Sequence, residues 1–581
     1  METWHVDRSR APIDVVDQTY PTIGAASEHY RKTTPVTSGQ GIPMVESAIQ
    51  CYPDLVRRAA AMRPDAKALL IDGRQRTYGE LLTNGQRWAR LISNLGLQSG
   101  ERLGLLLPNS VDLAEILLGA SMLGVPVVPI NTRFRAYEIA HVIADSAMSA
   151  LVTCDGIADI VDFPALLAEA LPGLHASADR SRLALAAAPH LRTIVTLGRS
   201  SKGIISCLEL DESETLPAFT VTPNHALLVL YTSGTSARPK GCVVAHHAIV
   251  ANALAIRDRY SISSEDVWWC PLPMFHIGGI VFISVIFAAA GFYVGMSHFT
   301  PEATFDLLER VRPTVFYPLF PTITLALIEH PRFAAVSKDC IRFVFSVAPP
   351  GVQKMIQAAF PHAVLLSAFG MTETCGVVTF NLPADDESLR FETCGVPLPG
   401  WQVSILDPAT RAPLPPGERG EIAVRGPGLF DGYFGHPELA LRQTTSDGYF
   451  LTGDLGVVDA SGYLSYLGRL KDQLKVGGEN VSALEIESFL ATHPAVNLAQ
   501  VVSLSDQKYG EVPVAFVELK SGARATEREL IDYCTGKIAR FKIPRYVRFV
   551  DTWPMSATKI LKYQLRDRIA SEFGSTKKAP V

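Results

Sequence analysis

The hydrophobic positions of the chain first become regular at Tyr52, and two periods alternate from there. Leu55, Ala59 and Met62 recur at helical spacing. The next segments predict a strand, a helix, a strand, a helix and a strand, at Ala68–Asp72, Tyr78–Leu95, Arg102–Leu107, Val111–Leu123 and Val127–Pro129. Strands that alternate with helices indicate α/β architecture with parallel sheets. Similar alternation continues to about Phe380, so we expect a large N-terminal α/β domain.

The pattern changes twice after Phe380. From Thr393 to Gly468, short apolar runs are broken by Gly and Pro turns (PLPPGERGEIAVRGPG), which predicts a small antiparallel, β-rich subdomain. The charged stretch GRLKDQLK then precedes a last region of mixed α and β pattern. We therefore expect a polar N-terminal extension over 1–48, a large domain over 49–470 that includes the β-rich subdomain, and a small α+β C-terminal domain over 471–581.

One apolar segment, Ile277–Met296, holds no charged residue and is long enough to span a bilayer. Because glycines interrupt it, we interpret it as a buried helix over about 279–290, a turn at Gly291 and a buried strand from Phe292. The flanks lack the positive bias of a membrane span. No stable membrane insertion is expected.

Composition narrows the class of protein. A chain of 581 residues is too long for one core, and a hydrophobic content of 48% supplies large ones. The formal charge is 53 − 58 = −5, so no positive field points to nucleic acid as a partner. Nine scattered cysteines without a CxxC pair, and an N-terminus without an apolar core, favour a cytoplasmic protein with reduced thiols. The oligomeric state stays open, with a homodimer as one option.

Candidate chemistry begins at Tyr231–Gly241, YTSGTSARPKG, directly after the apolar run Ala226–Leu230. Hydroxyls, backbone N–H groups and two cations after a buried strand suit the phosphates of a nucleotide. The spacing is not that of a Walker A loop. The segment resembles the phosphate loop of the adenylate-forming enzymes, the superfamily of acyl-CoA synthetases, luciferases and peptide-synthetase adenylation domains, whose usual form is TSGTTGxPKG.

Further motifs occur in the order of that superfamily and extend the resemblance over about 50–570: PLPMFHIGG, FGMTE, YFLTGD, LGRLKD and KVGGENVSALEIE. Departures occur as well. Ala237 stands where the phosphate loop usually has Gly, Phe369 replaces a Tyr, and SVAPPG replaces a Gly-rich adenine loop. The final lysine motif, PMSATKILKYQLR, lacks its glycine and is one residue shorter than usual.

The resemblance implies a nucleotide site. The phosphate loop would contribute Thr232, Ser233, Gly234, Thr235, Ser236 and Lys240, with Thr235 and Lys240 in catalytic roles. Glu373 would help to hold Mg²⁺, which needs few protein carboxylates because it keeps water and phosphate oxygens. Asp454 would accept hydrogen bonds from both ribose hydroxyls. The remaining nucleotide contacts implied are Ala348, Pro349, Phe369 and Gly370 at the adenine, Thr372 at a phosphate, and Arg469 at the ribose or a phosphate.

The resemblance also implies an acyl side and a thiol side. His276 would lie beside the carboxylate and the acyl group, and Gly477 and Gly478 beside the pantetheine arm of CoA. Lys471 would be the hinge about which the small C-terminal domain moves between the two half-reactions. Lys559 would contact the acyl phosphate, with the nearby Lys562 as the alternative if the shortened loop shifts its register.

The function implied is ATP-dependent activation of a carboxylic acid to acyl-AMP with Mg²⁺, followed by transfer to CoA. Alternatives are delivery of the acyl group to a separate carrier protein, a luciferase-like oxidation, and a non-catalytic nucleotide- or acyl-binding protein. A peptide-synthetase module would continue into a carrier domain, and this chain ends at Val581. Apolar residues near His276 and the lack of an evident carboxylate for an α-amino group favour a medium or long fatty acid, with aryl or steroid-derived acids next.

Overall fold

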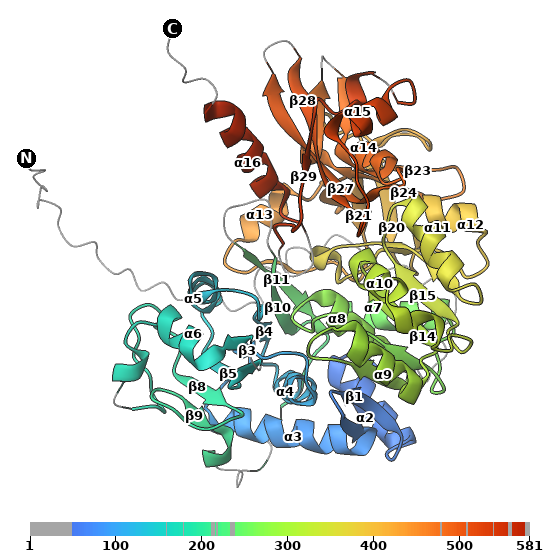
Figure 1. The fold of residues 1–581 in the computed structure, drawn as a ribbon. Helices are drawn as coiled ribbons and strands as arrows, with labels where there is room; N and C mark the ends of the chain where they lie inside the picture. Colours follow the sequence, from blue (N-terminus) through green and yellow to red (C-terminus); the bar gives the residue numbers. More distant parts are fainter. Residues whose placement is uncertain are drawn as a thin grey trace, which may run out of the picture. The chain divides into compact units, whose positions relative to one another are not determined.

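A computed structural model describes residues 49–157, 160–177, 179–210, 215, 219–232, 239–476, 479–506, 509–538, 540–555 and 560–575 (Figure 1). The first predicted elements form nearly as expected. They are α2 (Tyr52–Met62), β1 (Lys67–Ile71), α3 (Tyr78–Asn94), β3 (Leu103–Leu106), α4 (Val111–Met122) and β4 (Val127–Pro129). Helix α3 begins where the Thr77 side chain accepts a hydrogen bond from the backbone N–H of Glu80, whose own carboxylate accepts from the N–H of Thr77.

The first large sheet has seven strands, in the order β16 (Val364–Leu366), β15 (Phe343–Ser346), β14 (Val315–Leu319), β12 (Val267–Trp269), β13 (Phe292–Gly295), β1 and β2 (Arg74–Thr77). All neighbours in it run parallel except β1 and β2. The predicted parallel α/β architecture is thus confirmed.

The second large sheet has eight strands, in the order β22 (Gly432–Tyr433), β11 (Lys240–Ala245), β10 (Ala226–Thr232), β4, β3, β5 (Ala150–Thr153), β8 (Thr193–Thr196) and β9 (Ile205–Ser206). It is parallel from β10 to β9, whereas β10, β11 and β22 pair antiparallel. The two antiparallel pairings bring distant parts of the chain to one end of this sheet.

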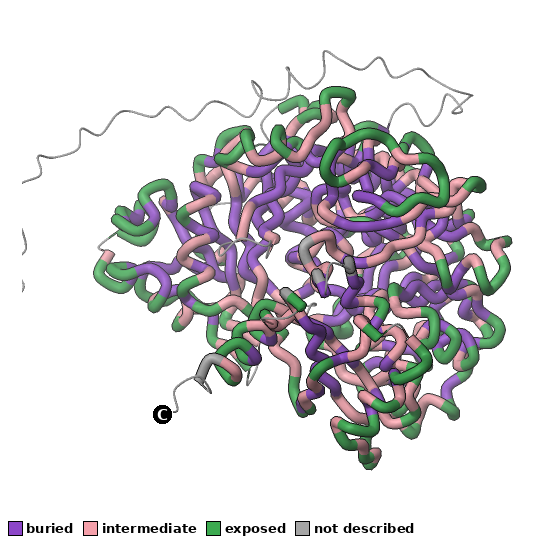
Figure 2. The backbone as a smooth tube through the Cα atoms, turned by 90° about the horizontal axis from the view of Figure 1, so that it is seen from above, coloured by how far each residue is buried: buried purple, intermediate pink, exposed green. Residues whose placement is uncertain are grey.

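Six strands of the seven-stranded sheet alternate between two cores, whereas β2 is polar and contributes to neither. Helices α2, α3, α4, α7 (His246–Arg259) and α8 (Ile277–Ala289) share one core with strands of both large sheets. On the other face of the seven-stranded sheet, α9 (Pro301–Val311), α10 (Pro321–Ile328) and α11 (Pro350–Ala359) pack in a second core. Figure 2 shows the buried backbone in the interior and exposed residues mainly in outer loops and helix faces.

The apolar segment forms α8, a turn and β13, as the sequence predicts, but the turn residue differs. Helix α8 ends with Ala290 in the left-handed conformation (φ +54°), and Gly291 N–H donates to Ile286 O in a Schellman motif. Gly291 is needed for another reason: a Cβ there would lie 3.0 Å from the carbonyl oxygens of Ser263 and Asp266. Within the described residues, no helix combines the length and apolarity needed to cross a membrane.

The β-rich part contains a four-stranded antiparallel sheet, β20 (Gln402–Leu406), β21 (Gly420–Arg425), β23 (Phe450–Val458) and β24 (Leu464–Arg469). A three-stranded sheet joins β17 (Ala368–Phe369), β18 (Thr379–Phe380) and β19 (Val396–Pro397). The four-stranded sheet matches the antiparallel subdomain that the Gly- and Pro-rich texture predicts over Thr393–Gly468. Strands β17 and β18 of the three-stranded sheet lie before Thr393, so antiparallel pairing begins earlier than the sequence predicts.

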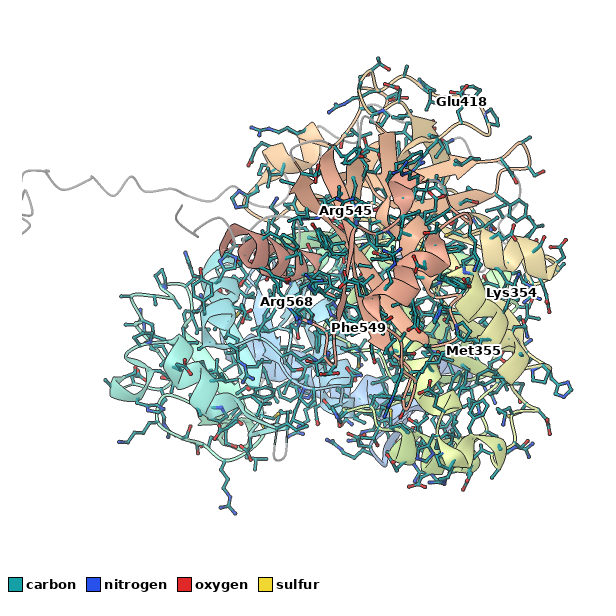
Figure 3. All side chains as sticks on the ribbon, turned by 45° about the horizontal axis from the view of Figure 1, so that its top comes forward. Lys354, Met355, Glu418, Arg545, Phe549 and Arg568 are labelled. Atoms are coloured by element: carbon teal, nitrogen blue, oxygen red, sulfur yellow. The ribbon has the colours of Figure 1, made fainter. Side chains whose placement is uncertain are left out.

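The C-terminal region is α+β, as predicted. Its sheet contains β26 (Glu479–Ser482), β25 (Gln473–Val476), β28 (Gly510–Leu519), β27 (Val496–Asp506) and β29 (Tyr546–Phe549). Its helices are α14 (Ala483–Leu490), α15 (Glu527–Cys534) and α16 (Lys562–Ser575). Arg568 of α16, labelled in Figure 3, lies 5.5 Å from the ring centroid of Phe516 on β28 and helps to hold the helix on the sheet.

Candidate active site

The predicted phosphate loop connects two antiparallel strands. Strand β10 leads into it and β11 leads out, and Thr232 pairs with Lys240 across its base. Ser233, Gly234, Thr235 and Ser236 lie outside the described residues. Of the predicted loop residues, the structure therefore places Thr232 and Lys240, and it places them opposite each other.

Helix α5 (Ala136–Asp145) contacts both flanks of this loop. Tyr231 Oη donates to Asp145 Oδ2 at 2.6 Å, and His141 Nε2 donates to the carbonyl oxygen of Pro239 at 3.0 Å. The His141 and Tyr231 rings also meet edge to face, with centroids 6.3 Å apart. Burial and the charge of Asp145 raise the pKa of the Tyr231 hydroxyl, so it stays a donor. Sequence reasoning missed His141 and Asp145, because nothing local ties a helix so far upstream to the loop.

Strand β22 brings Tyr433 between Lys240 and Glu373. Tyr433 lies opposite Cys242 in the β11–β22 register, and Lys240 Nζ lies 5.5 Å from the centroid of its ring. Tyr433 Oη donates to Glu373 Oε1 at 2.9 Å, and Glu373 is 8% exposed. Burial first, and then the charge of Glu373, raise the pKa of Tyr433. Two predicted site residues are thus linked through a tyrosine that the motifs did not mark.

A buried asparagine holds the turn that carries Glu373. Asn252 of α7 is 0% exposed, and its Nδ2 donates to the carbonyl oxygens of Thr374, Cys375 and Val377 at 2.9–3.1 Å. Its Oδ1 accepts from Trp401 Nε1 at 2.9 Å. The turn needs this support because Cys375 adopts the left-handed conformation with φ +51°, which is unfavourable for a residue with a side chain.

Asp454 lies in a bulge of β23 rather than in a hairpin turn. Glu421 pairs with Leu455 and Ala423 with Leu451, so three residues of β23 face one residue of β21. Gly453 adopts φ +70° there, and its N–H donates to the buried carboxylate Glu421 Oε1 at 3.0 Å. The bulge re-aims Asp454, which is 3% exposed.

Arg469 faces Asp454 from the next strand. The two residues are register partners in β23 and β24, and Arg469 Nε lies 3.0 Å from Asp454 Oδ1. Burial lowers the pKa of Arg469, but the charges of Asp454, Tyr466 and Glu373 together outweigh this and raise it overall. The Arg469 guanidinium is therefore within the electrostatic reach of both predicted carboxylates.

The predicted adenine residues lie on two strand ends. Phe369 ends β17, is 6% exposed, and has its ring centroid 6.0 Å from that of Tyr466 on β24. Gly370 permits a close approach, since a Cβ there would lie 2.0 Å from the carbonyl oxygen of Gly376. Thr372 follows at the start of the single turn η5 (Thr372–Thr374) and is half-buried. Ala348 and Pro349 lie between β15 and α11, where the Ala348 carbonyl oxygen accepts from Gln353 Nε2 at 3.0 Å.

His276 precedes α8, in a loop that buried Asn109 holds. Asn109 Oδ1 accepts from Met274 N–H at 2.6 Å, and its Nδ2 donates to the carbonyl oxygens of Leu272 and Met296. Gly279 lets the helix approach this loop, because a Cβ there would lie 2.5 Å from Pro273 O. Position and orientation of the His276 backbone are thus set by a polar residue some distance away in sequence.

The structure describes only some of the site residues predicted in the C-terminal region. Gly477, Gly478 and Lys559 lie outside the described residues, and Lys471 belongs to the turn η6 (Leu470–Asp472). Lys562 is placed: its Nζ forms an ion pair with buried Glu487 of α14, which also accepts from Val501 N–H at 2.7 Å. This pairing gives Lys562 a structural partner within the C-terminal region.

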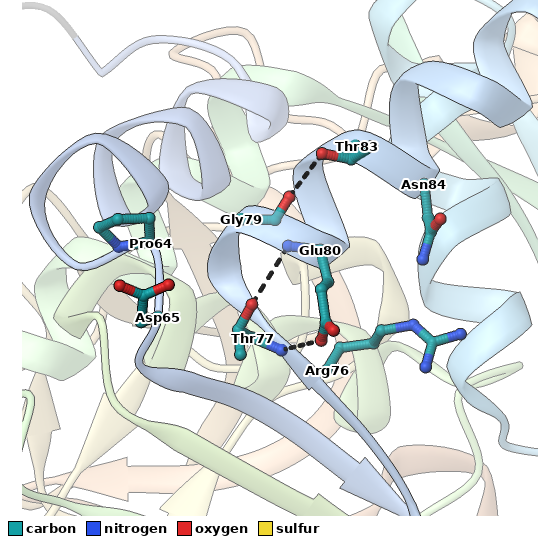
Figure 4. A pocket seen from close by; sticks show the side chains of 8 residues that line it. All are labelled: Pro64, Asp65, Arg76, Thr77, Gly79, Glu80, Thr83 and Asn84. Atoms are coloured by element: carbon teal, nitrogen blue, oxygen red, sulfur yellow. Dashed lines mark hydrogen bonds between the residues drawn. The ribbon is translucent and has the colours of Figure 1, made fainter.

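A surface hollow of about 450 Å³ at the start of α3 does not belong to this site (Figure 4). Most of its polar groups have partners within the fold: Thr77 and Glu80 cap the helix, Thr83 Oγ1 donates to Gly79 O at 2.8 Å, and Arg76 and Asn84 donate to Glu115 of α4. None of its lining residues lies in the predicted motifs.

The chain is similar to known proteins over most of its length. Residues 56–434 match the AMP-binding enzyme family, and residues 485–559 match the AMP-binding enzyme C-terminal domain. The chain is 30% identical to 4-coumarate–CoA ligase 1 of Petroselinum crispum, over 87% of this chain and 92% of that protein. It is 27% identical to the mitochondrial medium-chain acyl-CoA ligase ACSF2 of Danio rerio, over 95% of this chain and 92% of that protein. ATP-bound MatB of Rhodopseudomonas palustris superposes with a TM-score of 0.77 at 29% identity, over 90% of this chain and 99% of that one.

The chain belongs to the AMP-binding enzyme family, within the adenylate-forming superfamily. The predicted class, an AMP-forming ligase of the acyl-CoA synthetase kind, is confirmed, and the alternative of a non-catalytic binding protein is set aside.

Proposed function

We propose that this enzyme joins an apolar monocarboxylic acid to CoA through an acyl-AMP intermediate, with release of pyrophosphate and then AMP. The observation that carries the proposal is the convergence of Lys240, Glu373, Asp454 and Arg469, which come from four separated segments. Lys240 and Glu373 are joined through Tyr433, and Asp454 and Arg469 through an ion pair. Two buried carboxylates beside two cations suit a magnesium nucleotide better than they suit a purely structural role.

Each polar group has a proposed task on ATP. Asp454 is aimed by its bulge to accept from the ribose hydroxyls, and Arg469 neutralises it and contacts ribose or phosphate. The Phe369 ring stacks on adenine, beside the loop of Ala348 and Pro349. Thr232 and Lys240, with the loop between them, bind the phosphates.

The residues around Glu373 fit a magnesium ion that ATP brings with it. One carboxylate oxygen accepts from Tyr433, and the buried carboxylate supplies the hard oxygen ligand that Mg²⁺ prefers. Within the described residues no group of three or more His, Cys, Asp and Glu side chains gathers, so phosphate oxygens and water would complete the ligand set. Bound there, the ion would neutralise charge on the leaving pyrophosphate.

The first half-reaction is an attack of a carboxylate oxygen on the α-phosphorus of ATP. The bond from that phosphorus to the bridging oxygen of the β-phosphate breaks, and pyrophosphate leaves with the electron pair. Lys240 and, from the C-terminal region, Lys559 are the cations proposed to stabilise the charge on the α-phosphate. His276, at the start of α8, is proposed to lie beside the attacking carboxylate.

In the second half-reaction the CoA sulfur attacks the acyl carbon of acyl-AMP. The carbon–oxygen bond to the phosphate breaks, AMP leaves as the anion, and the thiol proton passes to solvent. We propose that the C-terminal region turns about Lys471 between the two steps and brings Gly477 and Gly478 to the pantetheine arm.

The acid is the least determined substrate. A medium-chain acyl-CoA ligase and a 4-coumarate–CoA ligase are both among the similar proteins, so the likeness supports apolar acids in general rather than fatty acids in particular. The cytoplasmic location and the homodimer stay predictions.

Pyrophosphate release from ATP and Mg²⁺, measured with a panel of carboxylic acids with and without CoA, tests the proposal. We expect acid-dependent pyrophosphate in both cases, and acyl-CoA plus AMP only with CoA. Glu373→Gln should lose pyrophosphate release, whereas Glu418→Gln, at an exposed carboxylate of the same β-rich part (Figure 3), should keep it. Acyl-AMP that reacts with a carrier protein and not with CoA would favour the carrier-loading alternative, and oxygen consumption would favour a luciferase-like one.

A further inference from the structure

Four aromatic rings fill the space beneath the predicted acyl site. Trp268, Phe282, Tyr317 and Phe345 are each at most 1% exposed. Every pair among them is in ring contact, with centroids from 3.9 Å (Phe282–Tyr317) to 6.4 Å (Phe282–Phe345). We call this group the aromatic block.

The aromatic block lies just below the carboxyl ends of three adjacent parallel strands, where α/β proteins bind their ligands. Tyr317 comes two residues before the end of β14, and Phe345 and Trp268 come one residue before the ends of β15 and β12. At about 3.3 Å per residue, the rings begin roughly 3–7 Å below that edge. Phe282 adds a ring from α8, the helix that begins directly after His276.

Most side chains around these strand ends are apolar. Leu319, Phe320 and Met371 are half-buried and pack against the same core, and Val347 is 42% exposed. Val347 N–H donates to Leu319 O at 2.8 Å, which joins the ends of β14 and β15. The strand-end segments VFYPLFPTI and FVFSVAPPG hold no charged residue, so nothing in them would pair with a second carboxylate of the substrate.

We propose that the aromatic block sets the depth of the acyl site and restricts the enzyme to short-chain or single-ring monocarboxylic acids. This inference rests on the proposed function. A straight chain of about ten carbons would extend past the strand ends and meet closely packed rings, whereas a short chain or one ring finds its apolar contacts at Leu319, Phe320, Val347 and Met371. Displacing a packed ring costs more free energy than the burial of a few substrate methylenes would give back.

The test is pyrophosphate release by the full chain with straight-chain acids from two to twelve carbons, and with benzoate and 4-phenylbutyrate. We expect kcat/KM to peak at six carbons or fewer, or at benzoate, and to fall at least tenfold by ten carbons. A wild-type peak at eight carbons or more would overturn the inference while leaving the proposed function intact. Absence of pyrophosphate with every acid would count against the proposed function itself and everything built on it.

Substitutions of Phe282 test whether the aromatic block limits the chain length of the acid. Phe282→Leu and Phe282→Ala should raise kcat/KM for the ten-carbon acid by at least tenfold, at about fourfold for each methylene newly buried, with less than threefold change for a three-carbon acid. Phe316→Leu is the matched control, since Phe316 is equally buried on β14 but stacks on Trp269 in the other core. Phe282→Leu keeps most of the side-chain volume should the alanine variant fail to fold. An unchanged chain-length profile in a folded Phe282→Leu enzyme, or an equal change in Phe316→Leu, would contradict the role of the aromatic block.

Discussion

The nucleotide side and the acyl side of the candidate site are built in opposite ways. On the nucleotide side, isolated charged residues are placed by backbone devices: a hairpin base at Lys240, a bulge at Asp454 and a strained turn after Glu373. On the acyl side, the strand-end segments hold no charged residue, and four packed rings lie below the strand ends. Polar recognition is local and therefore leaves motifs in the sequence, whereas the shape of an apolar space depends on residues from four elements at once.

The largest effect should separate the two lysines of the last motif. Lys559→Ala should slow adenylation by about 10²–10³, the usual loss for one preorganised donor, and leave CoA attack on supplied acyl-AMP nearly unchanged. Lys562→Ala should instead cost stability, about 3 kcal/mol, because buried Glu487 loses its partner. Single-turnover kinetics and urea unfolding of both variants measure this. Loss of adenylation in Lys562→Ala alone would reverse the assignment.

The next largest effect should show that a change on the nucleotide side leaves binding of the acid unaltered. Asp454→Asn removes a charge-assisted contact to ribose and should raise KM for ATP by about 10–100-fold, with KM for the acid changed by less than threefold. Asp447→Asn, at an exposed carboxylate just before β23, is the control. Steady-state kinetics with each substrate varied in turn decide the matter. Equal changes in both KM values would mean that the bulge supports the whole site.

Acid should weaken the fold at the end of the β10–β11 hairpin that lies away from the phosphate loop. His246 follows β11, is 0% exposed, and its Nδ1 accepts from Tyr52 N–H at 3.2 Å. Burial first, and then the neighbours His225 and His247, lower the pKa of His246 to about 3. Because the unfolded chain binds this proton more tightly, stability is complete above the ordinary histidine pKa and falls as pH drops through it. Between pH 7 and pH 5 the loss from this group should be about 2 kcal/mol.

His246→Asn keeps an acceptor for Tyr52 and removes the titration. The loss of unfolding free energy between pH 7 and pH 5 should therefore shrink by about 2 kcal/mol in this variant. Urea unfolding at the two pH values measures it, and an unchanged difference would mean that His246 binds its proton equally well in the native and the unfolded protein.

A smaller effect should come from α5, which contacts the phosphate loop from outside. Tyr231→Phe removes the hydrogen bond to Asp145 and should raise KM for ATP by about fivefold. Asp145→Asn should act through the same contact. The double variant should therefore have a KM for ATP no higher than that of the more impaired single variant. Strict additivity of the two effects in a double-mutant cycle would show that Asp145 acts by another route.

The smallest effect should come from Phe369, the residue whose ring we propose stacks on adenine. Phe369→Tyr restores the hydroxyl that this chain lacks at that position, in a setting where the ring is already buried near Tyr466. A single new hydrogen bond should lower KM for ATP by no more than about threefold. A change in KM for ATP beyond tenfold, in either direction, would show that the Phe369 ring does not lie where we have assigned it.

The sequence by itself determined the alternating helices and strands of the N-terminal part and the antiparallel texture of the β-rich part, and it predicted the polar residues of the nucleotide side. Each is encoded locally, by period, by turn residues, or by a motif of a few positions. It did not reveal Tyr433, Asn252, Asn109 or the His141–Asp145 pair, because their roles arise only from contacts made across a fold. Tertiary structure alone decided that Asp454 lies in a bulge, that Lys562 pairs with Glu487, and that four rings close the acyl side. The physical reason is that the volume left for a ligand is what remains after side chains from many elements have packed to nearly crystalline density. That volume cannot be predicted from any single stretch of sequence.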